Sequence, residues 1–213
     1  MNNTDVKTSG VTGTINPPAR EADSDTILVE QYLNGDTHAF ELLFKKYQAP
    51  VFNIVNRMVN GEEAYDITQD IFCSVLRALP SFRGEARFST WLYCIAKNAC
   101  LNRIRHKGRS KEDSLEAIIE EHPQSEFADE NTDVEETVEM HELQQLVNKV
   151  LETLPPDQRM IITLRDFEQL SYEEIATVTG MSIPTVKSRL HRARQAFKIK
   201  FKPYIALYGD ICG

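Results

Sequence analysis

The sequence predicts an all-α protein in which two small helical domains are joined by a flexible acidic linker. Apolar residues recur every three or four positions over residues 25–109 and again over 140–202, which is the spacing of one helix face. Residues 110–139 between them are rich in acids and have no firm periodicity. Glycine and proline are scarce outside a few clusters, and this argues against a β-sandwich or barrel.

The first domain follows a leader, residues 1–24, that is rich in Thr, Asn, Gly and Pro and is predicted to be disordered. Its three helices are expected over about 40–58, 67–79 and 90–105. Pro50 interrupts the first helix and should kink it. Pro80 ends the second, and residues 81–85 are expected to form a loop.

The second domain is predicted to end in a helix-turn-helix. Helical periodicity covers about 143–154 and 160–167, separated by Pro155 and Pro156. Ser171 and Glu174 have the spacing of a capping box, and Gly180 can supply the left-handed turn that ends a short helix. Ser182 can cap the next helix, which runs through 185–194 with Pro184 in its first turn. A short helix, a turn with glycine and a basic second helix are typical of this motif.

Charge is distributed unevenly along the chain. The formal net charge is −8, but residues 111–142 hold thirteen acids and one lysine. The other residues hold 23 basic and 19 acidic side chains. Residues 86–109 and 185–202 each contain several cations and no acid. Two basic stretches on either side of an acidic one favour a nucleic-acid-binding protein.

Several classes of protein are disfavoured. No run approaches the roughly eighteen apolar residues of a membrane span, and the leader lacks an apolar signal core, so a cytoplasmic protein is expected. The four cysteines show no short paired spacing. Cys73, Cys94 and Cys100 lie in apolar helical patterns and are predicted to be reduced thiols of the core. The alternative is a redox switch formed by Cys94 and Cys100. Cys212 lies in the apolar tail, 203–213, which could pack on the second domain or meet a regulator.

Catalysis is not expected. Asp66 and Asp70 lie one helical turn apart, but no further metal ligands are evident near them. The sequence has no His-x-x-x-His, no Gly-rich phosphate loop and no nucleophile elbow. We therefore predict no catalytic residue, no metal and no cofactor.

The second helix of the helix-turn-helix has one apolar and one polar face. Its inward positions are expected to be Val186, Leu190 and Ala193. Its outward positions are expected to be Lys187, Ser188, His191 and Arg192. In such a unit this helix enters the DNA major groove, where Lys and Arg can donate to guanine O6 and N7 or to phosphate. A solvated charged face is the alternative, but the cap, the turn and the absence of acids favour DNA.

The basic stretch of the first domain is interleaved with aromatic residues. The aromatic residues are Phe82, Phe88, Trp91 and Tyr93, and the cations are Arg83, Arg87, Lys97 and Arg103. Unstacked bases stack on aromatic rings while cations follow the backbone, so this pattern indicates single-stranded DNA. Core packing is the alternative for Phe88 and Trp91; the loop position of Phe82 favours a functional role.

Three motifs of the first domain and three of the second resemble one known family. They are Asp66–Phe72, Ser81–Gly84 and Thr90–Asn98, then Leu154–Pro155, Leu170–Ala176 and Thr185–Arg194. They resemble regions 2 and 4 of extracytoplasmic-function (group 4) sigma factors of the sigma-70 family, and most of all its envelope-stress branch. The resemblance covers about 25–109 and 140–200. A response-regulator-like transcription factor shares such a helix-turn-helix, but residues 25–109 lack the alternating strands of a receiver domain.

The resemblance implies an alternative sigma factor that binds core RNA polymerase, recognises −35 and −10 promoter elements and promotes DNA melting. The surface for the polymerase β′ clamp helices would contain Asp66, Gln69, Asp70 and Phe72. The single-stranded −10 element would meet Phe82, Arg83, Trp91, Lys97, Asn98, Arg103 and Arg105. The −35 element would meet Thr185, Lys187, Ser188, His191 and Arg192.

The resemblance also implies further partners and leaves two questions open. Region 4 would contact the β flap, and an anti-sigma factor could hold the protein at the membrane, away from the nucleoid, without insertion of the chain. The acidic linker is either a solvated spacer or a mimic of nucleic acid in the RNA exit channel. Without polymerase, the two domains are either extended or closed on each other with their DNA faces hidden.

Overall fold

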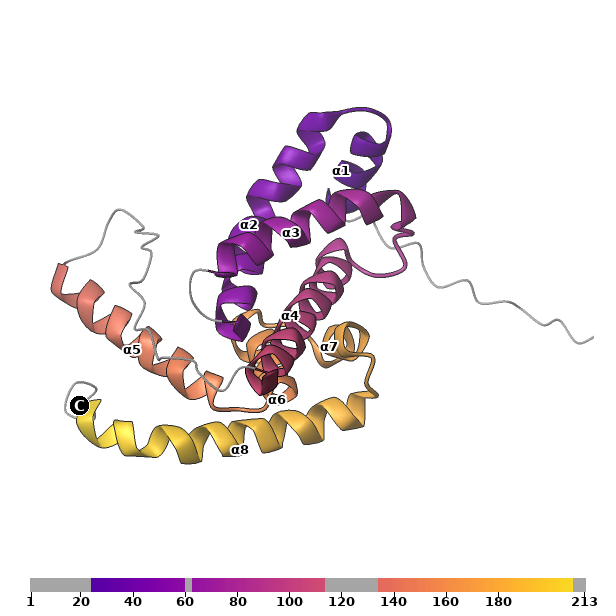
Figure 1. Ribbon diagram of the computed structural model, residues 1–213. Coiled ribbons are helices and arrows are strands. Elements are labelled where there is room, and N and C mark those ends of the chain that lie inside the picture. The colour runs from indigo at the N-terminus through magenta and orange to yellow at the C-terminus, as the bar shows by residue number, and fades with distance from the viewer. Residues whose placement is uncertain (1–23, 60–62, 114–133, 209–213) are drawn as a thin grey trace, which may run out of the picture.

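The computed structural model describes residues 24–59, 63–113 and 134–208, and every regular element in these ranges is helical (Figure 1). The first half contains α1 (Ser24–Leu33), α2 (Thr37–Val59), α3 (Glu63–Ala78), the 3₁₀ turn η1 (Leu79–Ser81) and α4 (Phe88–Asp113). The second half contains α5 (Val134–Glu152), α6 (Pro156–Ile162), the π-helical turn η2 (Thr163–Phe167), α7 (Tyr172–Thr179) and α8 (Ile183–Tyr208). The predicted all-α class is confirmed.

Helices α2, α3 and α4 pack around one apolar core, and α1 lies against α2. Pro50 lies inside α2 without ending it. Asp25 in the first turn of α1 is 2% exposed, and its carboxylate accepts hydrogen bonds from Lys46 and from the hydroxyl of Tyr47. Burial, and then Asp25, raise the pKa of Tyr47, so the phenol stays protonated and keeps α1 bound to α2.

Helices α5, α6 and α8 enclose a second, smaller core. Its buried members are Leu151, Leu154, Ile161, Ile162, Leu190 and Ala193. The inward positions predicted for the helix-turn-helix are confirmed, because Val186, Leu190 and Ala193 are at most 2% exposed.

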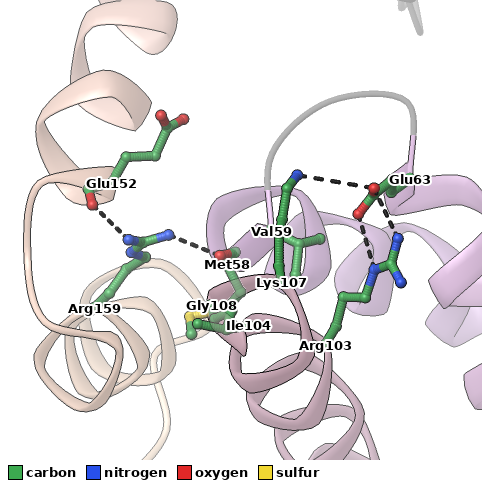
Figure 2. Close-up of a pocket in the computed structure, with 9 residues that line it drawn as sticks. All are labelled: Met58, Val59, Glu63, Arg103, Ile104, Lys107, Gly108, Glu152 and Arg159. Atoms are coloured by element: carbon green, nitrogen blue, oxygen red, sulfur yellow. Dashed lines mark hydrogen bonds and ion pairs between the residues drawn. The ribbon is translucent and has the colours of Figure 1, made fainter. Parts of the chain in front are cut away.

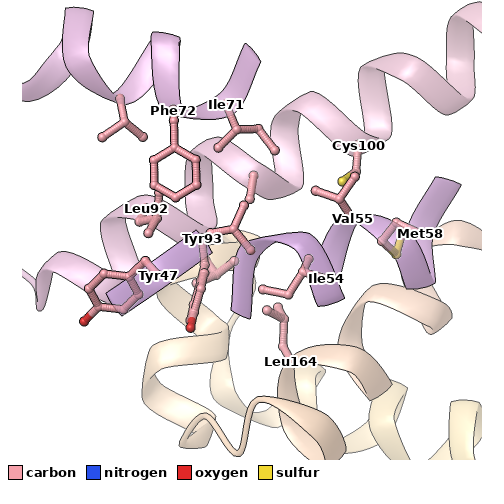
Figure 3. Packing of buried hydrophobic residues seen from close by; sticks show 14 of the residues in the cluster. Tyr47, Ile54, Val55, Met58, Ile71, Phe72, Leu92, Tyr93, Cys100 and Leu164 are labelled. Carbon is pink, nitrogen blue, oxygen red and sulfur yellow. The ribbon is translucent and has the colours of Figure 1, made fainter. Parts of the chain in front are cut away.

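The two domains are packed together rather than held apart. Met160, Leu164, Leu170, Ile175, Val178 and Val186 of the second half belong to the same buried cluster as the core of α2, α3 and α4. Leu164 lies next to Ile54 of α2 (Figure 3), and α7 packs along α4. The two domains are therefore closed on each other, but the predicted DNA-facing side chains Asn98, Lys187 and Arg192 remain exposed.

Helices extend past the predicted domain boundaries at three places. Helix α4 continues to Asp113 and α5 begins at Val134, so helices occupy both ends of the stretch predicted as a linker (110–139). Lys and Glu, which are frequent in these stretches, have high helix propensity. Helix α8 continues to Tyr208, past the boundary predicted at residue 202. Residues 1–23 of the predicted leader (1–24) and residues 114–133 of the predicted linker lie outside the described residues, while Ser24 begins α1.

None of the helices in the described ranges combines the length and apolar character needed to cross a bilayer.

Candidate nucleic-acid interface

An aromatic cluster marks the junction of η1 and α4. The ring centroids of Phe82 and Trp91 are 5.2 Å apart, and both rings lie within 5.8 Å of the Phe88 ring. Phe88 is 1% exposed, whereas Phe82 and Trp91 are half-buried. The Phe82 amide donates to the carbonyl of Leu79, which fixes the ring at the end of η1. Phe88 is therefore a core residue, and the other two rings rest on it with part of their surface in solvent.

A line of side chains continues from this cluster along α4. Trp91, Asn98 and Arg105 are seven residues apart, so they share one face of the helix. Asn98 and Arg105 are exposed, and Arg105 donates to Asn102 Oδ1 over 3.3 Å. Lys97 beside Asn98 is half-buried. Arg83 is exposed on the loop before α4, where Gly84 has a φ of +67°. The structure thus brings most of the residues predicted for single-stranded DNA to one side of α4.

Arg103 does not belong to that line. Its guanidinium makes two hydrogen bonds to the Glu63 carboxylate of α3, at 2.8 and 3.0 Å. The Arg103 hydrogen bond holds the pKa of Glu63 below its ordinary value, and Lys107 lies 3.8 Å from the same carboxylate. Arg103 therefore pairs α4 with α3 (Figure 2), and its predicted contact with DNA stays a prediction.

Helix α3 presents a polar face to solvent. Asp66, Gln69 and Asp70 are all exposed, and their spacing of three and four places them on one side of the helix. Phe72 is only 5% exposed and makes an edge contact with Phe44, with centroids 4.7 Å apart. The prediction that Phe72 forms part of a binding surface is therefore corrected.

Phe44 of α2 lies beside the polar face of α3. It falls within the apolar periodicity of residues 40–58, yet the side chain is 37% exposed. Periodicity identifies the apolar side of a helix but does not show where a neighbouring helix stops covering it, so no signal in the sequence distinguished Phe44 from its buried neighbours.

The helix-turn-helix has the predicted local chemistry. Ser171 Oγ accepts from the Glu174 amide over 3.1 Å, and Glu174 Oε2 accepts from the Ser171 amide over 2.9 Å. Gly180 ends α7 with a φ of +71°, and its amide donates to the Ala176 carbonyl. The capping box and the left-handed turn are both confirmed. They fix where α7 ends and α8 begins.

The first turns of α8 present a polar face. Lys187, Ser188, His191 and Arg192 are exposed. Thr185 is half-buried, its hydroxyl lies 2.8 Å from Ser182 Oγ, and its carbonyl accepts from Ser188 Oγ over 3.0 Å. The hydroxyls of Ser182, Thr185 and Ser188 therefore brace the start of the helix.

The four Lys and Arg side chains in the first three turns of α8 fall into two groups. Arg189 lies 3.3 Å from Asp157, and Arg194 is hydrogen-bonded to Asp166, so both are paired with acids of their own domain. Within the described part of the chain, neither Lys187 nor Arg192 has an ion-pair partner. Lys187 Nζ lies 5.3 Å from the centroid of the Tyr172 ring. Two cations therefore remain available on the face that a major groove would meet.

The three cysteines within the described residues are free thiols. Cys73 is exposed, which corrects its prediction as a core thiol, and Cys100 is fully buried. Burial raises the pKa of Cys100 to about 12 and also raises that of Cys94, although Lys97 opposes the latter shift. Among the described residues no three His, Cys, Asp or Glu side chains could hold a metal ion together. Cys212 lies outside these residues.

Comparison with known proteins agrees with this geometry. The family models for "Sigma-70 region 2" and "Sigma-70, region 4" match residues 43–110 and 144–197. The chain is 42% identical over 184 residues to the ECF RNA polymerase sigma-E factor of Escherichia coli K12, covering 85% of this chain and 96% of that one. It is 38% identical over 186 residues to the RNA polymerase sigma-H factor of Pseudomonas aeruginosa, covering 86% and 96%.

A solved structure has the same fold. It is the crystal structure of the sigma factor RpoE of Bartonella quintana in complex with the anti-sigma factor NepR. RpoE aligns with this chain with a TM-score of 0.62 and 26% sequence identity, and the alignment covers 76% of this chain and 96% of RpoE. The fold and the two matched domains are those of the sigma-70 family of transcription initiation factors. Within it, the chain belongs to the ECF RNA polymerase sigma factors. The first domain is accordingly called region 2 below, and the second region 4.

Proposed function

We propose that three separate surfaces divide the work of this sigma factor between core polymerase, the −10 element and the −35 element. The polar face of α3 binds polymerase, the aromatic end of α4 captures single-stranded DNA, and the start of α8 reads duplex DNA. The observation that carries this assignment is the division of the α8 cations, because Lys187 and Arg192 stay exposed while Arg189 and Arg194 are paired.

The −35 element is read by the N-terminal half of α8. Lys187 and Arg192 donate to guanine O6 and N7 or to phosphate, while Ser188 and His191 distinguish smaller features of the base edges. The Thr185 carbonyl accepts a hydrogen bond from Ser188 and holds that side chain in place. These roles follow from exposure and donor chemistry.

The −10 element is captured by Phe82, Trp91 and Asn98. A base extracted from the duplex stacks against the half-exposed rings, and the Asn98 amide can both donate to and accept from its edge. Arg83 and Arg105, at the two ends of this surface, and Lys97 follow the phosphates. Extracting a base costs a few kcal/mol, so binding the extracted base couples recognition to melting.

The polymerase surface consists of Asp66, Gln69 and Asp70, with Phe44 as its apolar neighbour in place of the buried Phe72. We assign this surface to the β′ clamp helices and region 4 to the β flap. An aromatic anchor within a polar rim is the usual anatomy of such an interface.

The protein is proposed to act in the cytoplasm, at the nucleoid, as a non-enzymatic subunit that an anti-sigma factor controls. The crystal structure of the Bartonella quintana relative, which contains the anti-sigma factor NepR, supports such control. The shared exposure of both DNA-facing surfaces would allow one inhibitor to mask them together.

The −35 assignment is tested by promoter binding of the reconstituted holoenzyme. Lys187→Ala should weaken binding by about 1–3 kcal/mol and relax base preference at one −35 position. Lys198→Ala is the matched control, because Lys198 is an exposed lysine on the same face of α8, three turns further on. Equal losses for both variants would contradict base reading by Lys187.

The other two surfaces are tested in the same system. Asn98→Ala should change −10 preference and leave holoenzyme assembly intact, whereas Asn53→Ala removes an exposed amide from α2 and should change neither. Asp70→Arg should weaken assembly with core polymerase, and Glu30→Arg makes the same charge change on α1 without that effect. Unchanged assembly with Asp70→Arg would remove α3 from the polymerase interface.

A further inference from the structure

The side chain of Tyr172 lies where the helix-turn-helix meets the rest of the protein. Tyr172 directly follows the N-cap Ser171, so the capping box fixes its place in the first turn of α7. The residue is half-buried and packs against both apolar clusters, the larger one around α2, α3 and α4 and the smaller one of α5, α6 and α8. Apolar neighbours therefore hold the ring, and part of its surface stays open.

Two cations from different elements lie over this ring. Arg165 of η2 has its Cζ 4.9 Å from the ring centroid, and Lys187 of α8 has its Nζ 5.3 Å from the same centroid. Both distances fall within the roughly 6 Å over which an aromatic ring face attracts a cation. The Tyr172 ring therefore connects η2 to the first turns of α8.

The Arg165 side of this arrangement is fixed by the backbone. Its Nη1 donates to the carbonyl of Leu170 over 2.6 Å, across the turn between η2 and α7. The amide of Leu170 donates in turn to the carbonyl of Leu164 over 3.0 Å. The position of the Tyr172 ring is therefore set by region 4 itself and does not depend on Lys187.

Lys187 is held differently from the other cations at the start of α8. Arg189 and Arg194 are paired with acids of region 4. Arg192 Nε donates to the carbonyl of Ser188, one turn earlier in the same helix, over 3.4 Å. Lys187 instead contacts another helix, α7, through an aromatic ring.

An aromatic contact suits a lysine that has to read a base. The ammonium stands on a flexible four-carbon stem, and fixing such a side chain on binding costs conformational entropy. A carboxylate partner would fix the ammonium but would also accept its N–H donors. An aromatic ring attracts the ammonium through its face, so donors remain available for guanine O6 and N7.

We propose that Tyr172 is a positioning residue for −35 recognition, whose ring orients the Lys187 ammonium towards the base edge that this lysine reads. The inference rests on the proposed role of Lys187 at the −35 element and adds to that site a residue outside α8. Tyr172 sets the direction of the cation, and Lys187 makes the contact.

A double-mutant cycle in promoter binding by the reconstituted holoenzyme tests this role. Tyr172→Leu should weaken binding about two- to fivefold, which is the size of an exposed cation–π contact. The loss should vanish in a Lys187→Ala background and persist in an Arg192→Ala background, because Arg192 is held within α8. A loosened region 4 would couple Tyr172 equally to both cations, and that result would overturn the proposal.

Tyr172→Phe separates the ring from the hydroxyl. Phenylalanine keeps the ring face, so this variant should bind the promoter as wild type does. Tyr172→Leu should relax the base preference at the −35 position that Lys187→Ala relaxes, while the salt dependence of binding stays near wild type because the lysine charge remains. Equal losses in Tyr172→Phe and Tyr172→Leu would mean that the hydroxyl contacts DNA directly, which contradicts positioning through the ring.

The ring contact can be observed without DNA, which separates this inference from the proposed function. In nuclear magnetic resonance spectra of the full chain, the ring should shift the Hε protons of Lys187 upfield in wild type and Tyr172→Phe, but not in Tyr172→Leu. If the shift is present but Lys187→Ala leaves promoter binding unchanged, the −35 role of Lys187 falls, and the positioning role falls with it. If Lys187→Ala weakens binding but the shift is absent from wild type, the −35 role stands and the positioning role alone falls.

Discussion

Leu164→Ala tests whether regions 2 and 4 share a core in solution. Leu164 is fully buried in the cluster that contains the core of α2, α3 and α4, beside Ile54. Removing its three terminal carbons should cost about 3 kcal/mol, within the range for buried Leu→Ala changes. For a unit of this size that cost corresponds to a fall in Tm of about 6–12 °C.

Ile161→Ala is the matched control. Ile161 is also fully buried and loses three carbons, but it belongs to the smaller core of α5, α6 and α8. Hydrogen exchange distinguishes the two variants, because a cost of 3 kcal/mol accelerates exchange about a hundredfold. Some openings unfold region 2 and leave region 4 folded, and in these Leu164→Ala should accelerate the hydrogen exchange of α2 amides. Ile161→Ala should leave the exchange of the same amides unchanged. Equal exchange of α2 amides in Leu164→Ala and wild type would refute a shared core.

Two further predictions concern local stability. Gly180→Ala should destabilise region 4 by about 1 kcal/mol, because alanine is strained at a φ of +71°. Gly108→Ala inside α4 should instead stabilise region 2 by up to about 1 kcal/mol, because alanine has the higher helix propensity. Neither new methyl group meets an atom within 4 Å, and urea unfolding measures both changes in stability. Glu63→Gln should destabilise region 2 by at most about 1 kcal/mol at neutral pH. The pKa of Glu63 is lowered in the folded state, so its contribution is fully present above its ordinary pKa of 4.5 and is lost as the pH falls through the lowered value. Thermal unfolding at several pH values should therefore show that the difference in Tm between wild type and Glu63→Gln disappears in acid. A difference in Tm that persists in acid would contradict the ion pair with Arg103.

Local features of the fold were predictable because they depend on residues close together in the chain. The capping box at Ser171 and Glu174 and the turn at Gly180 each need only a few consecutive residues, and both are confirmed. The same is true of the inward positions of α8, which follow from helical periodicity.

Features that depend on distant residues were not predictable. Arg103 is paired with Glu63, forty residues earlier, and no local pattern indicates this partner. Phe72 and Cys73 are neighbours in α3, yet one is buried and the other exposed, because the position of α2 decides which face of α3 is covered. Periodicity shows that a helix has two faces, but the tertiary arrangement decides what each face meets.

The closed arrangement also lies beyond sequence patterns. Leu164 and Val178 read as core residues of a small domain, and the sequence does not show that this core continues into region 2. The Arg57–Glu168 pair joins residues more than a hundred positions apart. Only the structure shows that α7 packs along α4, the helix proposed to bind the −10 element.

The most direct test of the account is run-off transcription by purified core RNA polymerase on a pool of promoter fragments, with and without this protein. We predict protein-dependent transcripts from a subset of fragments that share −35 and −10 elements, and loss of these transcripts with Lys187→Ala. Binding of the protein to duplex DNA without polymerase, and no protein-dependent transcript, would instead indicate a stand-alone helix-turn-helix regulator and would contradict the assignment of α3 and α4.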